Sequence, residues 1–168
     1  MTSIQIREAT EIDALDIVRI TNSAYEIEHF CIAGDRTDLK DVLSRMSKGT
    51  FFIAVSKDSP ETTPEAIGSV FLEFQKDRGY MGTLAVHPTH QGKGISKQLI
   101  SAVERATLSA GFSFLDITVL NLRTDLFPFY SALSFAPTAT ETFTRPANVI
   151  KPVHLIRMTK ALRPAHEL

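Results

Sequence analysis

The sequence predicts an α/β fold, in which one domain carries a mixed, mostly antiparallel central sheet flanked by about four helices. The chain has 168 residues, 43% of them hydrophobic, so residues 1–168 are expected to form a single domain with a substantial core. Short apolar runs bounded by turn residues alternate with longer amphipathic runs. A strand-like, a helix-like and a second strand-like run follow one another between residues 81 and 120, which predicts one parallel strand pair.

The first strand and two helices are expected in the N-terminal third. Ile4–Arg7 alternates as a strand does. A helix begins after Thr10, which acts as its cap with an acidic residue in the first turn, and ends near Tyr25. Its buried face is expected at Leu15, Val18, Ile20 and Ala24. A second helix begins at Thr37 and stops around Lys48.

Three strands are expected in the middle of the chain. Phe51–Val55 is a strongly apolar strand, and the Pro- and Thr-rich run Lys57–Glu65 is an exposed loop. Ile67–Phe74 forms the next strand, Lys76–Gly79 turns the chain back, and Tyr80–Val86 pairs with it as a hairpin.

The remaining elements lie in the C-terminal half. An amphipathic helix spans Ser96–Ala110, and Gly111 ends it. Leu115–Leu120 is the strand that lies parallel to the strand before the helix. Two closing strands, at about Thr138–Thr144 and Val153–Lys160, complete the sheet.

The loop Gln91–Ser96 carries the strongest functional signal. It leads from a strand through Gly92 and Gly94 into a helix, so unpaired backbone N–H groups and the positive end of the helix dipole face one place, which suits a phosphate. The nucleotide triphosphate loop is excluded because Lys93 stands between the glycines. The dinucleotide fingerprint is excluded because Lys97 occupies the position of its third glycine.

Val86-His87-Pro88 followed by Gln91-Gly92-Lys93-Gly94-Ile95-Ser96 resembles the acyl-CoA loop of the GNAT superfamily of N-acetyltransferases, which reads Gln/Arg-x-x-Gly-x-Gly/Ala after Val-x-Pro. The resemblance implies a single GNAT-like domain whose parallel strands splay apart, with acetyl-CoA as co-substrate. Ser96 stands where the family prefers Gly or Ala, so either a slight adjustment of the helix end or an added hydrogen bond from its hydroxyl to a phosphate is expected.

The resemblance also implies which other residues hold the cofactor. Tyr130, before Phe135, matches a tyrosine that contacts the CoA sulfur in the family and serves as general acid toward the leaving thiolate. Ser134 replaces the usual glycine of that segment. The residues expected to bind the cofactor are Leu84, Ala85, Val86, Gln91, Gly92, Lys93, Gly94, Ile95, Ser96, Asn121, Phe129 and Tyr130. Without the loop, Tyr130 would be read as an aromatic packing residue.

The sequence offers several candidates for the general base that deprotonates the amine and does not choose among them. Glu28 and His29 lie in the segment between the first two helices, which faces the acceptor in the superfamily, and a histidine near its ordinary pKa of ~6.5 can accept a proton. Glu73 is a third catalytic candidate on a strand, although strand alternation favours an exposed carboxylate there. His154 is a fourth, with a structural role as the alternative.

Charge and composition exclude several other classes of function and partner. With 18 basic and 19 acidic residues the net charge is −1, which gives no case for a nucleic-acid or membrane partner. The single cysteine, Cys31, is expected to be a buried apolar residue in a reducing environment. No metal-ligand cluster is expected, nor a signal peptide or membrane span, so the expected location is the cytoplasm.

The resemblance implies acetyl transfer to a primary amine of a small molecule by direct attack in a ternary complex. Two alternatives remain at this point: a CoA-binding regulator without turnover, and a protein or peptide N-acetyltransferase. The acceptor is not identified by the sequence. A homodimer is possible, since the Phe-rich C-terminal third could form either core or interface.

Overall fold

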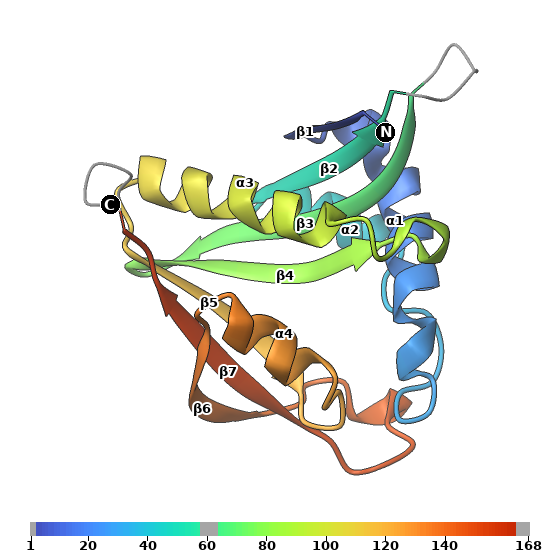
Figure 1. Cartoon of the computed structure of the whole chain (residues 1–168). Helices are drawn as coiled ribbons and strands as arrows, with labels where there is room; N and C mark the ends of the chain where they lie inside the picture. The colour runs from blue at the N-terminus through green and yellow to red at the C-terminus, as the bar shows by residue number, and fades with distance from the viewer. Residues whose placement is uncertain (1–2, 58–63, 164–168) are drawn as a thin grey trace.

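A computed structural model describes residues 3–57 and 64–163 (Figure 1). The strands are β1 (Ile4–Glu8), β2 (Thr50–Ser56), β3 (Glu65–Gln75), β4 (Arg78–Val86), β5 (Phe114–Leu120), β6 (Ala136–Thr142) and β7 (His154–Ala161). The α-helices are α1 (Ala14–Tyr25), α2 (Leu39–Met46), α3 (Ile95–Ser109) and α4 (Leu126–Ala132). Short 3₁₀ turns are η1 (Glu11–Asp13), η2 (Glu26–Glu28), η3 (Pro88–His90) and η4 (Pro146–Asn148). The predicted strands and helices are confirmed, whereas the expected exposed loop Lys57–Glu65 lies mostly outside the described residues.

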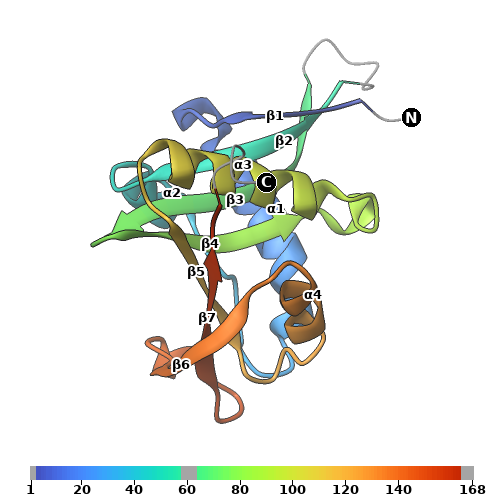
Figure 2. The same ribbon diagram turned by 60° about the vertical axis from the view of Figure 1, so that its left-hand side comes forward.

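The strands form one mixed sheet in the order β1-β2-β3-β4-β5-β7-β6. Neighbouring strands are antiparallel except β4 and β5, which are parallel as predicted. This pair is registered only at Gly79 with Leu115 and at Tyr80 with Asp116. Beyond those residues the two strands separate, so the sheet opens into a V with β1–β4 in one arm and β5, β7 and β6 in the other (Figures 1 and 2).

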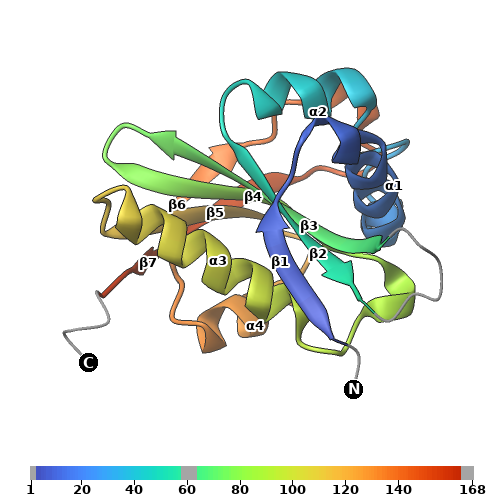
Figure 3. The same ribbon diagram turned by 90° about the horizontal axis from the view of Figure 1, so that it is seen from above.

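Helices cover both faces of the first arm (Figure 3). Side chains alternate across β2: Phe52 and Ala54 pack toward α3, whereas Phe51, Ile53 and Val55 pack toward α1 and α2. This alternation follows the period of two in a strand and divides the core into two layers. Both layers are apolar, and α3 supplies Ile95, Leu99, Ile100, Ala102 and Val103 to the larger one.

The buried face of α1 differs from the expected one. Ala14, Ile17, Ile20 and Thr21 are buried, whereas Leu15 is 67% exposed. The prediction of Leu15 as a core residue is therefore wrong, and it missed Ile17. A 3₁₀ turn precedes the helix, and its Asp13 side chain accepts a hydrogen bond from the Thr10 N–H at 2.8 Å. Leu15 and Ile20 are five residues apart, so in a helix of 3.6 residues per turn they do not lie on the same face.

The point of the V is held by a buried carboxylate. Asp116, 1% exposed, receives hydrogen bonds from Arg157 Nη1 at 2.9 Å, from the Thr159 hydroxyl at 2.7 Å and from Arg78 Nη1 at 3.3 Å. These donors come from β7 and β4, the strands on either side of β5. A buried carboxylate needs such donors to offset its lost hydration, so this cluster fixes where β4 and β5 stop pairing.

Two loops close the open end of the V. The Ala33 N–H donates to the Asn148 carbonyl at 2.8 Å, and the Ile150 N–H donates to the Cys31 carbonyl at 2.9 Å. Ile32 forms an isolated bridge with Val149 between them. Cys31 is fully buried in this junction, as the sequence predicted, and burial raises its pKa. The loop after α1 is therefore tied to the loop between β6 and β7.

Candidate active site

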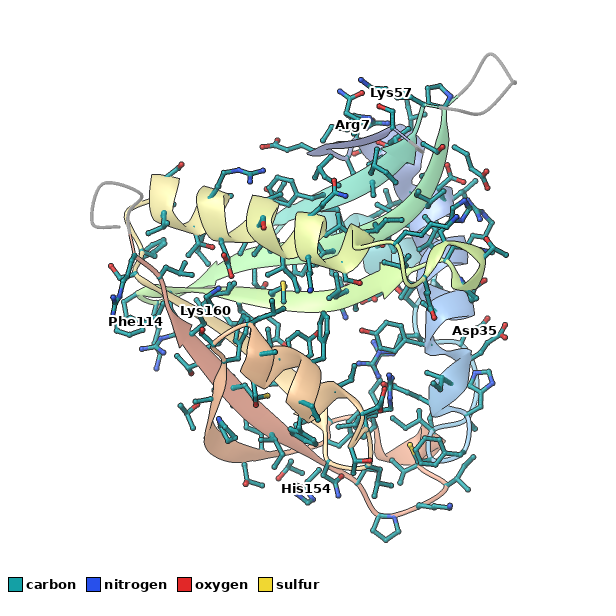
Figure 4. The ribbon with its side chains drawn as sticks, in the orientation of Figure 1. Arg7, Asp35, Lys57, Phe114, His154 and Lys160 are labelled. Carbon is teal, nitrogen blue, oxygen red and sulfur yellow. The ribbon has the colours of Figure 1, made fainter. Side chains whose placement is uncertain are left out.

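The separation of β4 and β5 opens a cavity of about 740 Å³. Both strands line it, together with the end of α1, helix α4 and the loops that close the V. Figure 4 shows side chains of both arms pointing into the space between them. Beyond Tyr80, β4 has no registered partner in β5, so this edge offers backbone N–H and C=O groups to an extended ligand.

The edge of β4 is distorted at the middle of the cavity. Thr83 and Leu84 together oppose Val70 on β3, which is the arrangement of a β-bulge. Thr83 has φ 46°, in the left-handed region that β-branched residues rarely adopt. Its hydroxyl is buried and has no hydrogen-bond partner among the described residues. Strained backbone of this kind costs about 1–3 kcal/mol and gathers at functional sites.

The glycine loop presents a row of unpaired donors. Gly92 and Gly94 both have φ 77°, and Gly94 is the N-cap of α3. The first bond into the helix runs from the Gln98 N–H to the Gly94 carbonyl at 3.3 Å. Within the part of the chain that the structure describes, the backbone N–H groups of residues 92–97 have no acceptor. The loop thus has the geometry of an anion site at a helix N-terminus, as the sequence predicted.

Most of the residues expected to bind the cofactor border the cavity. Its walls include Leu84, Ala85, Val86, Gln91, Ser96, Phe129 and Tyr130. Gly92, Lys93 and Gly94 lie in the exposed loop beside it, and the Ile95 side chain is buried in the core under α3. The Gln91 side chain donates from Nε2 to the Val86 carbonyl at 3.0 Å, which fixes the loop to the end of β4.

Asn121 does not reach the cavity wall. Its side-chain oxygen accepts a hydrogen bond from the His154 N–H at 2.9 Å, and its own N–H donates to the His154 carbonyl at 3.0 Å. These bonds extend the pairing of β5 with β7 by one residue. Asn121 therefore joins the end of β5 to the start of β7, and the structure does not place it against the cofactor cavity.

Tyr130 lies on α4 and lines the cavity. The residue is 7% exposed, and its ring packs edge-on against Phe129 and Phe135 at centroid distances of 5.0 and 5.7 Å. The hydroxyl makes no hydrogen bond to any described residue, and burial raises the pKa of Tyr130 well above its ordinary value. A phenol in this setting is protonated at neutral pH and has a free hydrogen to donate.

Glu28 is a buried carboxylate at the closed end of the cavity. Its Oε1 accepts a hydrogen bond from Arg123 Nη1 at 3.1 Å, and its Oε2 lies 3.7 Å from Arg36 Nη1. Burial raises the pKa of Glu28, although the two arginines oppose that shift. A carboxylate whose pKa is raised is a better proton acceptor near neutral pH than an exposed one.

The other candidate bases lie elsewhere. The His29 ring is exposed and pairs with the Gly34 carbonyl at 3.1 Å from Nε2, outside the cavity wall. Glu73 lies two residues before the end of β3 and accepts a hydrogen bond from the Gln75 side chain, also outside that wall. His154 is exposed at the start of β7, at the lower end of the V in Figure 4.

Several cavity residues escaped the sequence analysis. They are Tyr25, Arg36, Tyr80, Thr83, Arg123 and Arg145. Tyr80 shares a hydrogen bond of 2.8 Å with the Thr118 hydroxyl, between the β4 and β5 arms. No local motif marks these residues, because their partners lie far away in the sequence. The only signals available were the positive charges of Arg36, in the segment between the first two helices, and of Arg123, just after β5.

The residues 3–57 and 64–163 contain no group of His, Cys, Asp and Glu side chains arranged to hold a metal ion. None of the described helices combines the length and the apolar character that crossing a membrane requires.

A family model described as acetyltransferase (GNAT) family matches residues 15–135, which include the glycine loop and Tyr130. Among curated protein sequences, none matches the chain.

Solved structures with similar folds include the ribosomal-protein-S18-alanine N-acetyltransferase of Escherichia coli. It has a TM-score of 0.75 and 14% identity, with 97% of this chain and 96% of that chain covered. The paia N-acetyltransferase of Thermoplasma acidophilum, solved with coenzyme A, has a TM-score of 0.74 and 16% identity over 95% and 99%. The yncA protein of Salmonella typhimurium, solved with its cofactor acetyl-CoA, has a TM-score of 0.71 and 18% identity over 95% and 94%.

Proposed function

The chain belongs to the GNAT family of acetyltransferases, and from that premise we propose that it transfers an acetyl group from acetyl-CoA to the primary amine of a small molecule by direct attack in a ternary complex. It is accordingly an acyltransferase. The observation that carries the proposal is the row of unpaired N–H groups at residues 92–97 beside a cavity bordered by the unpaired edge of β4.

These two features suit the two ends of the donor. The pyrophosphate of acetyl-CoA carries negative charge, which the N–H groups and the dipole of α3 would stabilise. The pantetheine arm contains amides, which can pair with the free edge of β4 as an added strand would. Gln91 holds the two features together through its bond to the Val86 carbonyl. The thioester would then lie near the bulge at Thr83.

The chemistry requires one proton acceptor and one donor. The amine nitrogen forms a bond to the acetyl carbon, the bond between that carbon and the CoA sulfur breaks, and the amine loses a proton. Glu28 is the group proposed to accept that proton, because it alone of the four candidate bases borders the cavity. Tyr130 is proposed to donate a hydrogen bond to the departing thiolate, since its hydroxyl has no partner among the described residues.

The raised pKa of Tyr130 defines its part more closely. A thiol has an ordinary pKa of ~8.5, well below that of a buried phenol, so complete proton transfer from Tyr130 to the thiolate is unfavourable at equilibrium. A hydrogen bond that strengthens as negative charge develops on sulfur lowers the barrier without such a transfer.

The acceptor class rests on the shape of the closed end. The loops at residues 31–33 and 148–150 are bonded to each other and close the V next to Glu28. This favours a small amine over an extended peptide. The Escherichia coli relative in fold acts on a ribosomal protein, which keeps peptide acetylation as the alternative to test.

An acetylation assay tests the proposal. The purified protein is incubated with acetyl-CoA and either a panel of small amines or a panel of peptides, and both acetylated product and free CoA thiol are measured. The proposal predicts equal amounts of the two products with a small amine, and initial rates that depend on both substrates as in a sequential mechanism. Acetylation of peptides alone would favour the alternative, and CoA binding without any product would indicate a regulator.

A further inference from the structure

Two guanidinium groups at the closed end of the cavity have unfilled hydrogen-bond donors. The Arg36 side chain lies 4.9 Å over the ring of Tyr25 and 3.7 Å from Glu28, and it makes no hydrogen bond to any described side chain or backbone group. The Arg145 side chain makes one, from Nη1 to the Arg36 carbonyl at 2.9 Å. A guanidinium has five N–H donors in a planar fork, so most donors of both groups remain open.

The other arginines of the cavity, Arg123 and Arg45, are hydrogen-bonded to carboxylates. Arg123 donates from Nε and Nη2 to Asp125 at 3.0 and 2.9 Å, and from Nη1 to Glu28. Arg45 donates from Nε to Asp41 at 3.1 Å. Arg36 and Arg145 differ from them, because both line the cavity and neither is hydrogen-bonded to a carboxylate among the described residues.

Both open arginines are held in place before any ligand arrives. Arg36 follows the loop after α1 and Arg145 lies in the loop between β6 and β7, and these loops are joined by the bonds at Ala33 and Ile150. Arg145 adds a direct link to the Arg36 backbone. Stacking on Tyr25 restricts the plane of the Arg36 fork. Such preorganisation reduces the entropy lost when an anion binds.

We propose that the acceptor carries a carboxylate next to its primary amine, as an amino acid does, and that Arg36 and Arg145 bind this carboxylate while Glu28 receives the amine. This inference rests on the proposed function and names its substrate class. A single guanidinium can recognise a planar carboxylate through two parallel hydrogen bonds, and a second guanidinium adds further donors and charge. The 3.7 Å between Arg36 and Glu28 requires the amine and the carboxylate of the acceptor to be close together.

A carboxylate fits this end better than a phosphate. Glu28 and the exposed Glu26 also line the cavity, and they would repel a group with nearly two negative charges more strongly than one with a single charge. The same two carboxylates attract the ammonium of the acceptor. An internal residue or the N-terminus of a protein has no carboxylate beside its amine, so the arrangement argues against peptide acceptors.

Matched pairs of acceptors test the inference. Each of a panel of amino acids is compared with its own carboxamide, which keeps the amine and the side chain and removes only the negative charge. We measure kcat/KM for acetylation and, by calorimetry in the presence of CoA, the equilibrium affinity of each compound. At least one amino acid is expected to exceed its amide by about tenfold or more in both measurements.

Three variants test whether Arg36 and Arg145 cause the preference for the amino acid over its amide. Arg36→Gln and Arg145→Gln are expected to reduce kcat/KM for the acid about tenfold or more and to leave the amide within about threefold. Arg105→Gln, on the exposed surface of α3 outside the cavity wall, is the matched control and should leave both unchanged. Circular dichroism and acetyl-CoA affinity show whether each variant is folded.

Equal kcat/KM values for every acid and amide, or equal losses for both in Arg36→Gln, would overturn the inference while amine acetylation itself stood. Preference for peptides with a blocked C-terminus would overturn it as well. An acid that binds more tightly than its amide in an Arg36-dependent way, but is never acetylated, would support the carboxylate site and overturn the proposed function instead. The absence of binding and acetylation for the whole panel would overturn both.

Discussion

Glu28 accepts a hydrogen bond from Arg123 at 3.1 Å although the two residues are 95 positions apart in the sequence. Glu28 ends the turn after α1, and Arg123 follows β5 in the other arm of the V. The bond therefore spans the cavity at its closed end. It also orients the carboxylate that we propose as the proton acceptor, while burial raises its pKa.

Replacing Glu28 by Gln is expected to lower kcat by about 10²–10⁴-fold. Glutamine keeps the size of the side chain and an oxygen for Arg123, but it cannot accept the proton of the amine. Steady-state kinetics measure the loss, and Glu11→Gln on the exposed turn η1 serves as a control expected to behave as the wild type. An unchanged kcat in Glu28→Gln would remove Glu28 from the mechanism.

The dependence of kcat/KM on pH, on its acid side, is expected to report the ionisation of Glu28. Glu28 accepts a proton only when it is ionised, so kcat/KM falls as the pH drops through its pKa, which burial raises above the ordinary carboxyl value of ~4.3. The wild type is expected to lose activity at a higher pH than an exposed glutamate would allow, and Glu28→Gln to lose that limb. A limb that persists in the variant would assign it to another group or to the amine itself.

Tyr130→Phe is expected to lower kcat by about 10²–10³-fold and to leave the affinity for acetyl-CoA within about twofold. Phenylalanine keeps the edge-on packing against Phe129 and Phe135 and removes only the hydroxyl. Tyr80→Phe is the matched comparison, because the Tyr80 hydroxyl is already bonded to Thr118, and its effect on kcat should be far smaller. Equal effects of the two variants would contradict a role for Tyr130 toward the thiolate.

Ser134→Gly is expected to stabilise the protein. Ser134 follows α4 with φ 72°, and the Phe135 N–H donates to the Tyr130 carbonyl at 3.1 Å, as at a helix end closed by a left-handed residue. That conformation costs a non-glycine residue about 1–2 kcal/mol, partly offset by the chain entropy of glycine, so a net gain of about 0.5–1 kcal/mol in the free energy of unfolding is expected.

Urea denaturation measures this gain, and Ser131→Gly within α4 provides the control. Ser131 is exposed and helical, so glycine there should destabilise the protein by a few tenths of a kcal/mol, in the opposite direction. A loss of stability in Ser134→Gly would show that the serine makes a favourable interaction that outweighs its strained backbone.

The parts of the site that lie in continuous sequence could be predicted. The glycine loop, the strand before it and the helix after it are neighbours along the chain, so their geometry follows from local patterns. Ser134, which replaces the usual glycine of its segment, adopts the left-handed conformation that glycine favours. The parallel pairing of β4 and β5 followed from the order of the elements.

The acceptor end could not be predicted in the same way. Arg36, Arg123 and Arg145 come together only because the loops at residues 31–33 and 148–150 join, and no period in the sequence encodes that junction. Glu73 and His29 were reasonable candidates by residue type, but the cavity lies away from both. The misplacement of Leu15 on α1 has a local cause, since Leu15 and the buried Ile20 are five residues apart and cannot share one face of a helix with 3.6 residues per turn.

Calorimetric titration with acetyl-CoA tests the account most directly when Gly94→Trp is compared with Gly111→Trp. Both glycines have positive φ, at 77° and 87°, and an added Cβ meets nothing within 4 Å at either, so the conformational cost is matched at opposite ends of α3. We expect micromolar affinity in the wild type and Gly111→Trp, and a loss of about 100-fold or more in Gly94→Trp. Absence of binding by the wild type, or equal affinity in all three proteins, would contradict it.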